Sequence, residues 1–303
     1  MALICRQLSL IPMADIRPQA WSLLIRWKQS ERYIDAILSE AISSLSENEK
    51  QSLSRLTNGT LIFLRQLEAV LVQFLKKAKS LPPDLITLLQ LAAFELLHQD
   101  NSPDYAVVHS AVALTRKHFG KLAGLSNSVL HNVIRWRDDG AWSRWLKDPK
   151  ISLGLRYSFP DWLVERWQVQ FPHDLEILLN TLNGEPLRMV WLLEPSIREE
   201  FLHFLQEARL EPKINPYDDA FIEVKRLQPL LKSDFFKNGQ ITIQDVSTTF
   251  PAKLLTEIPP DATICDLCAA PGGKTISLRK RFPENQLIAA DISKKRLKQL
   301  DSN

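Results

Sequence analysis

The sequence predicts a multidomain chain: an all-α domain, then a small α+β module, then the start of an α/β core. Three observations predict this order. Residues 13–146 place apolar residues at three- and four-residue steps, as helices do. Residues 150–238 mix helix and strand patterns. Residues 239–303 read as strand, helix and strand around the stretch DLCAAPGGKT. Because the chain has 303 residues, two or three domains are expected, with boundaries at 1–146, 150–238 and 239–303.

The first segment is predicted to be helical throughout. Proline-containing breaks at 80–84 and 101–104 each stop one helix and restart another, since an acidic residue follows the proline in the new first turn. A helical segment of this size has enough apolar surface for its own core. Its apolar-periodic stretches are WSLLIRW, DAILSEAISSL, LSRLTNGTLIFLRQLEAVLVQFLKK, DLITLLQLAAFELLHQ, YAVVHSAVALTRKHF and GLSNSVLHNVIRW.

The middle segment is expected to begin with a short helix from Pro160, whose residues Trp162, Leu163, Trp167 and Phe171 would face inward. The remaining pattern predicts strand, helix, then shorter strands, which is typical of a small α+β module. These later elements are LRMVWLL, IREEFLHFLQEARL, AFIEV and GQITIQ.

The third segment reads as a βαβ unit. TICDL is its first strand, and a helix runs from about Lys274 to Arg281. QLIAAD at 286–291 is the second strand, and Ser293 caps a further helix.

Charge is distributed unevenly along the chain. Residues 1–150 carry 19 Lys and Arg against 14 Asp and Glu, residues 151–262 carry 11 against 17, and residues 263–303 carry 8 against 4. A basic excess suits binding to a polyanion such as RNA, and suits a solvated helix face as well. The local cluster that predicts an RNA contact consists of Arg116, Lys117 and Lys121, with Arg135 and Arg137 nearby.

Cysteine usage and hydropathy limit the class of protein. Three cysteines, Cys5, Cys265 and Cys268, are too few and too scattered for a disulfide framework or a zinc site. A reducing, cytoplasmic compartment is therefore expected, with no bound metal. No apolar run is long enough to span a bilayer, and Arg6 interrupts the apolar start, so neither a membrane segment nor a signal peptide is expected.

The stretch DLCAAPGGKT ends like a phosphate-binding loop. That loop, however, requires glycine where this chain has Cys268, which argues against a nucleoside triphosphatase. A cofactor with a free ribose fits better, since Asp291 ends the second strand 18 residues beyond Gly273 and can accept hydrogen bonds from ribose hydroxyls. S-adenosylmethionine has a ribose and a sulfonium and no phosphate. A plain strand–turn–helix remains the alternative.

Taken together, DLCAAPGGKT and AADISKKRL resemble the cofactor-binding start of the bacterial 16S rRNA 5-methylcytosine methyltransferases of the RsmB (Sun/Fmu) family. The resemblance extends to GLSNSVLHNVIR at 124–135, YSFPDWLVERW at 157–167 and GQITIQDVSTTF at 239–250. It implies an all-α NusB-like RNA-binding domain, a small α+β linker module and the start of a Rossmann-like methyltransferase core. One departure is LRMVWLLEP, which lacks the Arg-x-Asn pattern expected there.

The resemblance also implies where the cofactor binds. In the family, the loop backbone and the strand-two acid hold S-adenosylmethionine. Cys268 occupies a loop position, so a small, partly buried thiol is expected there rather than a nucleophile. The positions carried over are Cys268, Ala269, Ala270, Pro271, Gly272, Gly273, Lys274 and Asp291.

The reaction implied is methylation of small-subunit ribosomal RNA at cytosine C5. A cysteine thiolate adds to C6, and the activated ring then takes the methyl group. The family's cysteines for this chemistry lie in later ProCys and ThrCys motifs, which do not occur in these 303 residues. No catalytic residue is therefore predicted, and this chain alone is expected to be an inactive fragment that binds cofactor weakly. The alternative is a stand-alone NusB-like RNA-binding, transcription-antitermination protein with a vestigial cofactor half.

Overall fold

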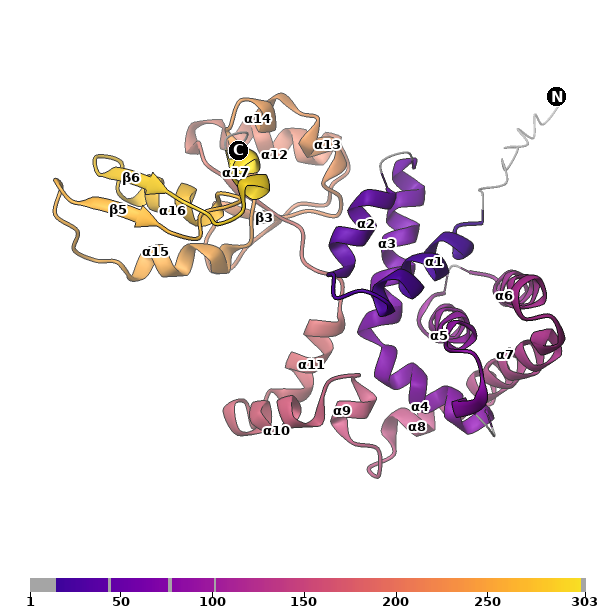
Figure 1. Ribbon diagram of the computed structural model, residues 1–303. Helices are drawn as coiled ribbons and strands as arrows, with labels where there is room; N and C mark the ends of the chain where they lie inside the picture. Colours follow the sequence, from indigo (N-terminus) through magenta and orange to yellow (C-terminus); the bar gives the residue numbers. More distant parts are fainter. Residues whose placement is uncertain (1–14, 43–44, 76–77, 101, 301–303) are drawn as a thin grey trace, which may run out of the picture. The chain divides into compact units, whose positions relative to one another are not determined.

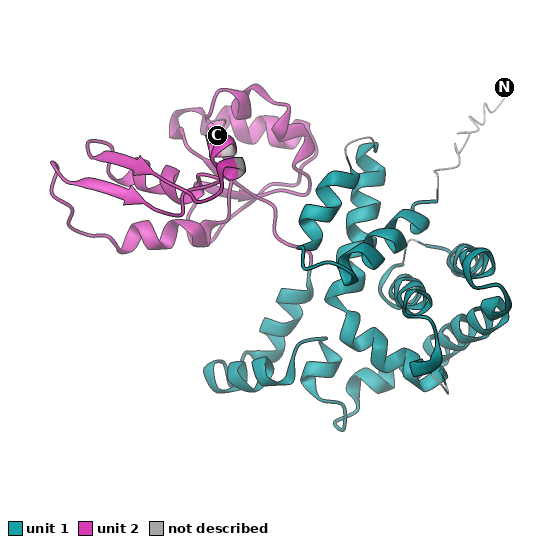
Figure 2. Cartoon of the chain, viewed as in Figure 1, with its two compact units in different colours: residues 1–184 teal, residues 185–303 magenta. Residues whose placement is uncertain are grey.

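A computed structural model describes residues 15–42, 45–75, 78–100 and 102–300 (Figure 1). The chain forms two compact units, residues 1–184 and 185–303 (Figure 2). The finer division predicted at 146–150 and 238–239 stays a prediction.

The first unit contains helices and no strand where it is described; the sequence predicted this for residues 13–146, whereas residues 150–184 were assigned to the α+β module. Its central element is α5 (Pro83–His98), which packs against α1, α3, α4, α6 and α7. Because α5 is apolar on nearly all sides, it is buried all round, as a core helix must be. The helices are α1 Arg17–Lys28, α2 Ile34–Ala41, α3 Glu47–Ile62, α4 Leu64–Phe74, α5, α6 Asp104–Phe119, α7 Ala123–Asp138, α8 Ala141–Lys147, α9 Leu153–Arg156, α10 Asp161–Gln170 and α11 Leu175–Asn183, with short 3₁₀ turns η1 Ala78–Ser80 and η2 Gly120–Leu122.

Helix boundaries follow local chemistry. Ser46 and Glu49 form a reciprocal capping box at the start of α3, which satisfies two backbone donors. Pro82 and Pro103 are the N-cap residues of α5 and α6, and Pro83 is the first residue of α5, so these helices begin at the predicted breaks. The long helix predicted over 53–77 is instead interrupted at Phe63, whose backbone leaves the helical region. Its ring stacks on His98 with centroids 3.9 Å apart, a tertiary contact that the periodicity could not indicate.

The inward face predicted for α10 is wrong for its aromatic ends. Trp162 is 63% exposed and Phe171 is 44% exposed. The buried residue is Val164, which packs with Leu175 and Leu179 of α11. Helix α11 was not predicted from the sequence, and together with α9 it covers the Val164 side of α10.

The second unit contains two sheets. The first has four antiparallel strands in the order β2-β3-β1-β4, and the second pairs β5 with β6 in parallel. The strands are β1 Met189–Leu192, β2 Lys213–Ile214, β3 Phe221–Glu223, β4 Ile241–Ile243, β5 Thr263–Asp266 and β6 Gln286–Ala289. The helices are η3 Pro195–Ile197, α12 Arg198–Glu207, α13 Gln228–Leu231, α14 Asp234–Lys237, η4 Val246–Thr249, α15 Phe250–Leu254, α16 Gly273–Arg281 and α17 Lys294–Leu300.

Strand β1 is buried on both faces, which explains its uninterrupted apolar sequence. Val190 and Leu192 face Phe201 and Leu205 of α12. On the opposite face, Trp191 belongs to a smaller cluster that includes Ile276 of α16. The four-stranded sheet therefore supports the helix that follows the DLCAAPGGKT loop.

The predicted βαβ unit is present. β5 and β6 run parallel with Asp266 opposite Ala289, so their carboxyl ends lie at one edge. Ser293 Oγ accepts the N–H of Arg296 at 3.3 Å, which confirms the predicted cap of α17. In the described ranges, no helix has both the length and the apolar character needed to cross a membrane.

Candidate functional site

Asp266 links the start of the DLCAAPGGKT loop to its end through hydrogen bonds. Its Oδ1 accepts the backbone N–H of Cys268 at 3.2 Å, and its Oδ2 accepts the hydroxyl of Thr275 at 2.7 Å. Only 8% of Asp266 is exposed, so these two donors replace the water that a carboxylate would otherwise bind. The sequence pattern indicated no separate role for Asp266.

The turn before α16 depends on two glycines for different reasons. Gly272 has φ +120°, a conformation that residues with a Cβ rarely adopt. At Gly273 the approach is close, because a Cβ there would lie 3.1 Å from the side-chain amide of Gln244, which would have to shift. The backbone thus enters α16 sharply and leaves the first N–H groups of that helix at the loop.

Asp291 joins the second strand to the loop. Its Oδ2 accepts the N–H of Ala270 at 3.2 Å, and its Oδ1 accepts the N–H of Ser293 at 2.9 Å. The Ser293 hydrogen bond, with the positive charge of Arg296, lowers the pKa of this carboxyl below its ordinary value. Asp291 is therefore ionised at neutral pH and can only accept hydrogen bonds. Arg296 also donates to the carbonyl of Ala270 at 2.7 Å.

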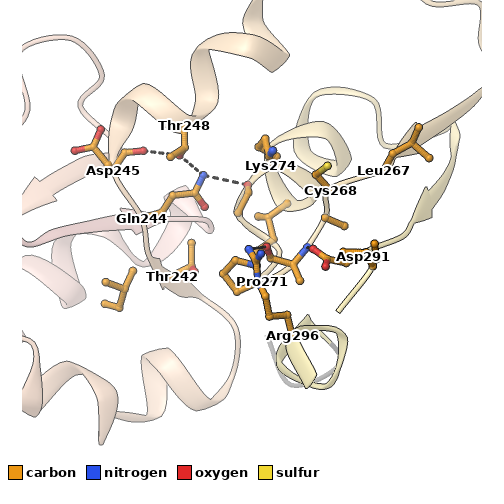
Figure 3. A pocket seen from close by; sticks show the side chains of 16 residues that line it. Thr242, Gln244, Asp245, Thr248, Leu267, Cys268, Pro271, Lys274, Asp291 and Arg296 are labelled. Atoms are coloured by element: carbon orange, nitrogen blue, oxygen red, sulfur yellow. Dashed lines mark hydrogen bonds between the residues drawn. The ribbon is translucent and has the colours of Figure 1, made fainter. Parts of the chain in front are cut away.

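A cavity of about 810 Å³ lies against this loop (Figure 3). Its size is in the range of small-molecule and cofactor sites. Seven of the eight predicted site residues line it, and the eighth, Gly272, shapes the turn behind it. The lining residues are Thr242, Ile243, Gln244, Asp245, Thr248, Leu267, Cys268, Ala269, Ala270, Pro271, Gly273, Lys274, Ile276, Asp291, Ile292 and Arg296.

One wall of the cavity was not predicted from the sequence. Gln244 follows β4, and its Nε2 donates to the carbonyl of Gly273 at 3.0 Å and to Thr248 Oγ1 at 2.5 Å. The segment GQITIQDVSTTF, which contains Gln244, carries a family resemblance but no motif that marks this glutamine. These hydrogen bonds hold the start of α16 against the end of β4 (Figure 3).

The two described cysteines are both free and exposed. The expectation that the Cys268 thiol is partly buried is therefore wrong, although its neighbours Ala269 and Ala270 are buried. Cys5 lies outside the described residues. Among the residues that the structure describes, no group of three or more His, Cys, Asp or Glu could hold a metal ion.

The predicted basic cluster of the helical unit is only partly available. Arg116, Lys117 and Lys121 are exposed, and none forms an ion pair with another described residue. Arg137 is not free, since it pairs with Asp104 through two hydrogen bonds and donates to the carbonyl of Leu96.

Arg135 donates to the side chain of Asn132 on the same helix. The predicted surface is therefore best defined by three residues, Arg116, Lys117 and Lys121, which are called the basic cluster below.

Comparison with known proteins agrees with this order of parts. The NusB family model matches residues 14–135, and the model described as 16S rRNA methyltransferase RsmB/F matches residues 253–303. The predicted fold class is thereby confirmed: a NusB-like helical domain comes first, and the start of a methyltransferase core comes last.

Curated relatives match most of the chain. Ribosomal RNA small subunit methyltransferase B of Serratia proteamaculans is 32% identical over 283 residues, covering 89% of this chain and 62% of the relative. The protein of that name from Photorhabdus laumondii is 28% identical over 275 residues, with coverage of 89% and 62%. The probable counterpart from Bacillus subtilis is 28% identical over 293 residues, with coverage of 94% and 64%. The chain therefore spans a little under two thirds of the length of these relatives.

A solved structure shows the same fold. The protein in the crystal structure of PH0851 superposes with a TM-score of 0.64 at 19% identity, over 95% of this chain and 66% of that one.

Proposed function

We propose that this chain, which is related to the RsmB/F 16S rRNA methyltransferases, binds S-adenosylmethionine in the cavity beside Asp291 and supplies the cofactor site, without the catalytic cysteines, for C5 methylation of cytosine in small-subunit ribosomal RNA. The observation that carries the proposal is that Asp291 accepts a hydrogen bond from the loop backbone at the carboxyl ends of β5 and β6. In open α/β sheets, ligands bind at this edge.

The chemistry of the cavity suits each part of the cofactor. Ionised Asp291 is an acceptor for the two ribose hydroxyls, and it would repel a phosphate at the same place. The N-terminus of α16 and Lys274 favour the cofactor's carboxylate. Ile292 and Leu267 supply apolar surface for a planar base.

A nucleoside triphosphate fits this cavity less well. Cys268 stands where the phosphate-binding loop requires glycine, and the carboxylate of Asp291 faces the same space. When bound, S-adenosylmethionine supplies an electrophilic methyl group. The described residues of this chain would hold and orient that cofactor.

The helical unit is proposed to bind the ribosomal RNA substrate through the basic cluster. Its three cations have no acidic partner among the described residues, so they can neutralise phosphates. The alternative of an RNA-binding protein without a cofactor is less well supported, because the cavity keeps its glycines, its loop anchor Asp266 and its acid Asp291 together.

The test is calorimetric titration of the 303-residue chain with S-adenosylhomocysteine, which keeps the ribose and amino-acid parts. We expect Asp291→Ala to weaken binding at least about tenfold, since a hydrogen bond to a charged group contributes about 1.5–3 kcal/mol. The matched control is Asp234→Ala, an exposed aspartate paired with Lys237 in the same unit. RNA binding without any binding of the nucleoside would favour the cofactor-free alternative.

A further inference from the structure

A second cavity, in the first unit, lies between α6 and α7. It has a volume of about 300 Å³. Its floor is apolar, and its rim is polar. The residues lining it are Tyr105, Val108, His109, Val112, Ala113 and Arg116 of α6, with Asn127 and His131 of α7. We call this feature the α6–α7 groove.

The polar side chains of the groove take no part in holding the fold. Tyr105 is 78% exposed, and His109, Asn127 and His131 are exposed as well. Within the described residues, none of these four forms a side-chain hydrogen bond to protein. Other polar residues of the same helices are used structurally; Thr115, for example, donates to the carbonyl of Ala111 and contacts Ser126.

The formal charge of the side chains that line the groove is positive. No carboxylate lines it among the residues that the structure describes. Asp104, at the start of α6, and Asp138, at the end of α7, both pair with Arg137, and the exposed Asp139 follows α7. Arg116 lines one end of the groove, and Lys117 and Lys121 follow it in the chain. The occupant that complements this surface is therefore anionic.

The aromatic and amide groups indicate the kind of anion. Tyr105 and Arg116 are eleven positions apart on α6, so they are separated by about 16 Å along the helix axis. This is too far for one phosphate or one carboxylate to reach both. An exposed aromatic ring at one end and a cation at the other suit single-stranded nucleic acid, because a base stacks on the ring and a phosphate meets the cation.

We propose that the α6–α7 groove binds a single-stranded segment of RNA, with one base stacked on Tyr105 and the strand running past His131 and Asn127 toward Arg116. This rests on the proposed function in one respect, namely that RNA is a partner of the chain. It adds a base-binding site to the phosphate contacts of the basic cluster. The groove suits an unpaired base, since the edges of a base in a duplex are not free to enter it.

The test is fluorescence anisotropy of the full 303-residue chain with a labelled single-stranded RNA and with a duplex of the same sequence. Tyr105→Ala should weaken single-strand binding about tenfold and leave duplex binding unchanged, since stacking contributes about 1–3 kcal/mol per base. The loss of affinity should be the same at low and high salt, because stacking releases no counterions. Tyr105→Phe should bind as the unmodified chain does.

The control is Tyr33→Ala, which removes an equally exposed tyrosine, 86% exposed, from the same unit. Equal loss for Tyr33→Ala and Tyr105→Ala would overturn the proposal, as would equal loss for single strand and duplex. Unchanged single-strand binding by Tyr105→Ala would also overturn it. If the unmodified chain bound no RNA at all, the proposed RNA partner itself would be wrong.

Discussion

Arg137 of α7 holds Asp104 of α6 through two parallel hydrogen bonds, Nη1 to Oδ1 at 3.0 Å and Nη2 to Oδ2 at 2.7 Å. Nη1 of the same guanidinium also donates to the carbonyl of Leu96 at 2.9 Å, near the end of α5. Three helices therefore meet at one side chain. A planar guanidinium can make all these bonds at once, and a lysine could not.

We predict that Arg137→Met lowers the free energy of unfolding of the helical unit by about 1–2 kcal/mol at pH 7, more than an exposed pair would. The hydrogen bonds from Arg137 lower the pKa of Asp104, so the stabilisation is present above its ordinary value of 3.8 and is lost as pH falls through the lowered one. Urea unfolding at several pH values checks this. Arg144→Met, at an exposed arginine, is the control. If Arg137→Met lowered the free energy of unfolding as much in acid as at pH 7, the prediction would be contradicted.

The basic cluster should contribute to RNA affinity electrostatically. Reversing Arg116, Lys117 and Lys121 to Glu should weaken binding to a ribosomal RNA segment and make it less dependent on salt. The slope of the logarithm of the binding constant against the logarithm of the salt concentration should change by about 0.7 for each phosphate of a single strand that the variant no longer neutralises. Anisotropy titrations over a range of salt concentrations measure both effects. Reversal of Arg166, Arg226 and Lys232, which are exposed elsewhere, should alter binding much less; equal effects would leave the cluster without a specific role.

Periodicity and short motifs predicted much of this fold. Local patterns identified most helices of the first unit, though not α11, and also strands β1, β3, β4, β5 and β6 and the position of Asp291 at the end of β6. The failures share a physical cause. The break at Phe63, the exposure of Trp162 and the pairing of Arg137 depend on residues distant in sequence. Gln244 is also such a case, because only the folded chain brings the end of β4 to Gly273.

Closure of the cofactor loop should depend on the Thr275 hydroxyl. Thr275→Val keeps the shape of the side chain and removes the 2.7 Å hydrogen bond to buried Asp266. We expect a local cost of about 1–3 kcal/mol, since a charged acceptor loses a partner. Amide hydrogen exchange should become faster at Cys268, whose N–H shares that carboxylate. Thr263→Val, at an exposed threonine on β5, should leave the exchange rate at Cys268 unchanged. Equal exchange rates at Cys268 in the two variants would contradict the prediction.

Gly272→Ala should disturb the start of α16 through backbone strain alone. A Cβ there would meet Leu300 at 3.5 Å, an ordinary contact, whereas φ of +120° is unfavourable for alanine. The expected cost is about 1–3 kcal/mol, with weaker binding of S-adenosylhomocysteine. Gly124→Ala is the matched control, since Gly124 is helical and a Cβ there would have no atom within 4 Å; that variant should be neutral or slightly more stable. Calorimetric binding and urea unfolding distinguish the two.

His98 should make the helical unit less stable in mild acid. Its ring stacks on Phe63, lies edge-on to Trp142, and is hydrogen-bonded through Nε2 to Gln66 Oε1 at 2.8 Å. Since the amide oxygen can only accept, Nε2 carries a hydrogen. Burial lowers the pKa of this imidazole from 6.5 to about 4. Between these values the unfolded chain binds a proton that the folded chain does not, so the free energy of unfolding falls as pH falls from about 6.5 to about 4. The total loss is about 3 kcal/mol at about 1.36 kcal/mol per pKa unit.

His98→Leu removes the titration and leaves Gln66 without its partner, so it should be less stable at pH 7 and show a flatter pH profile over this window. Urea unfolding of both forms at intervals from pH 7 to pH 4 gives the two profiles, with exposed His131→Leu as control. Parallel profiles for the unmodified chain and His98→Leu would show that this imidazole does not carry the pH dependence.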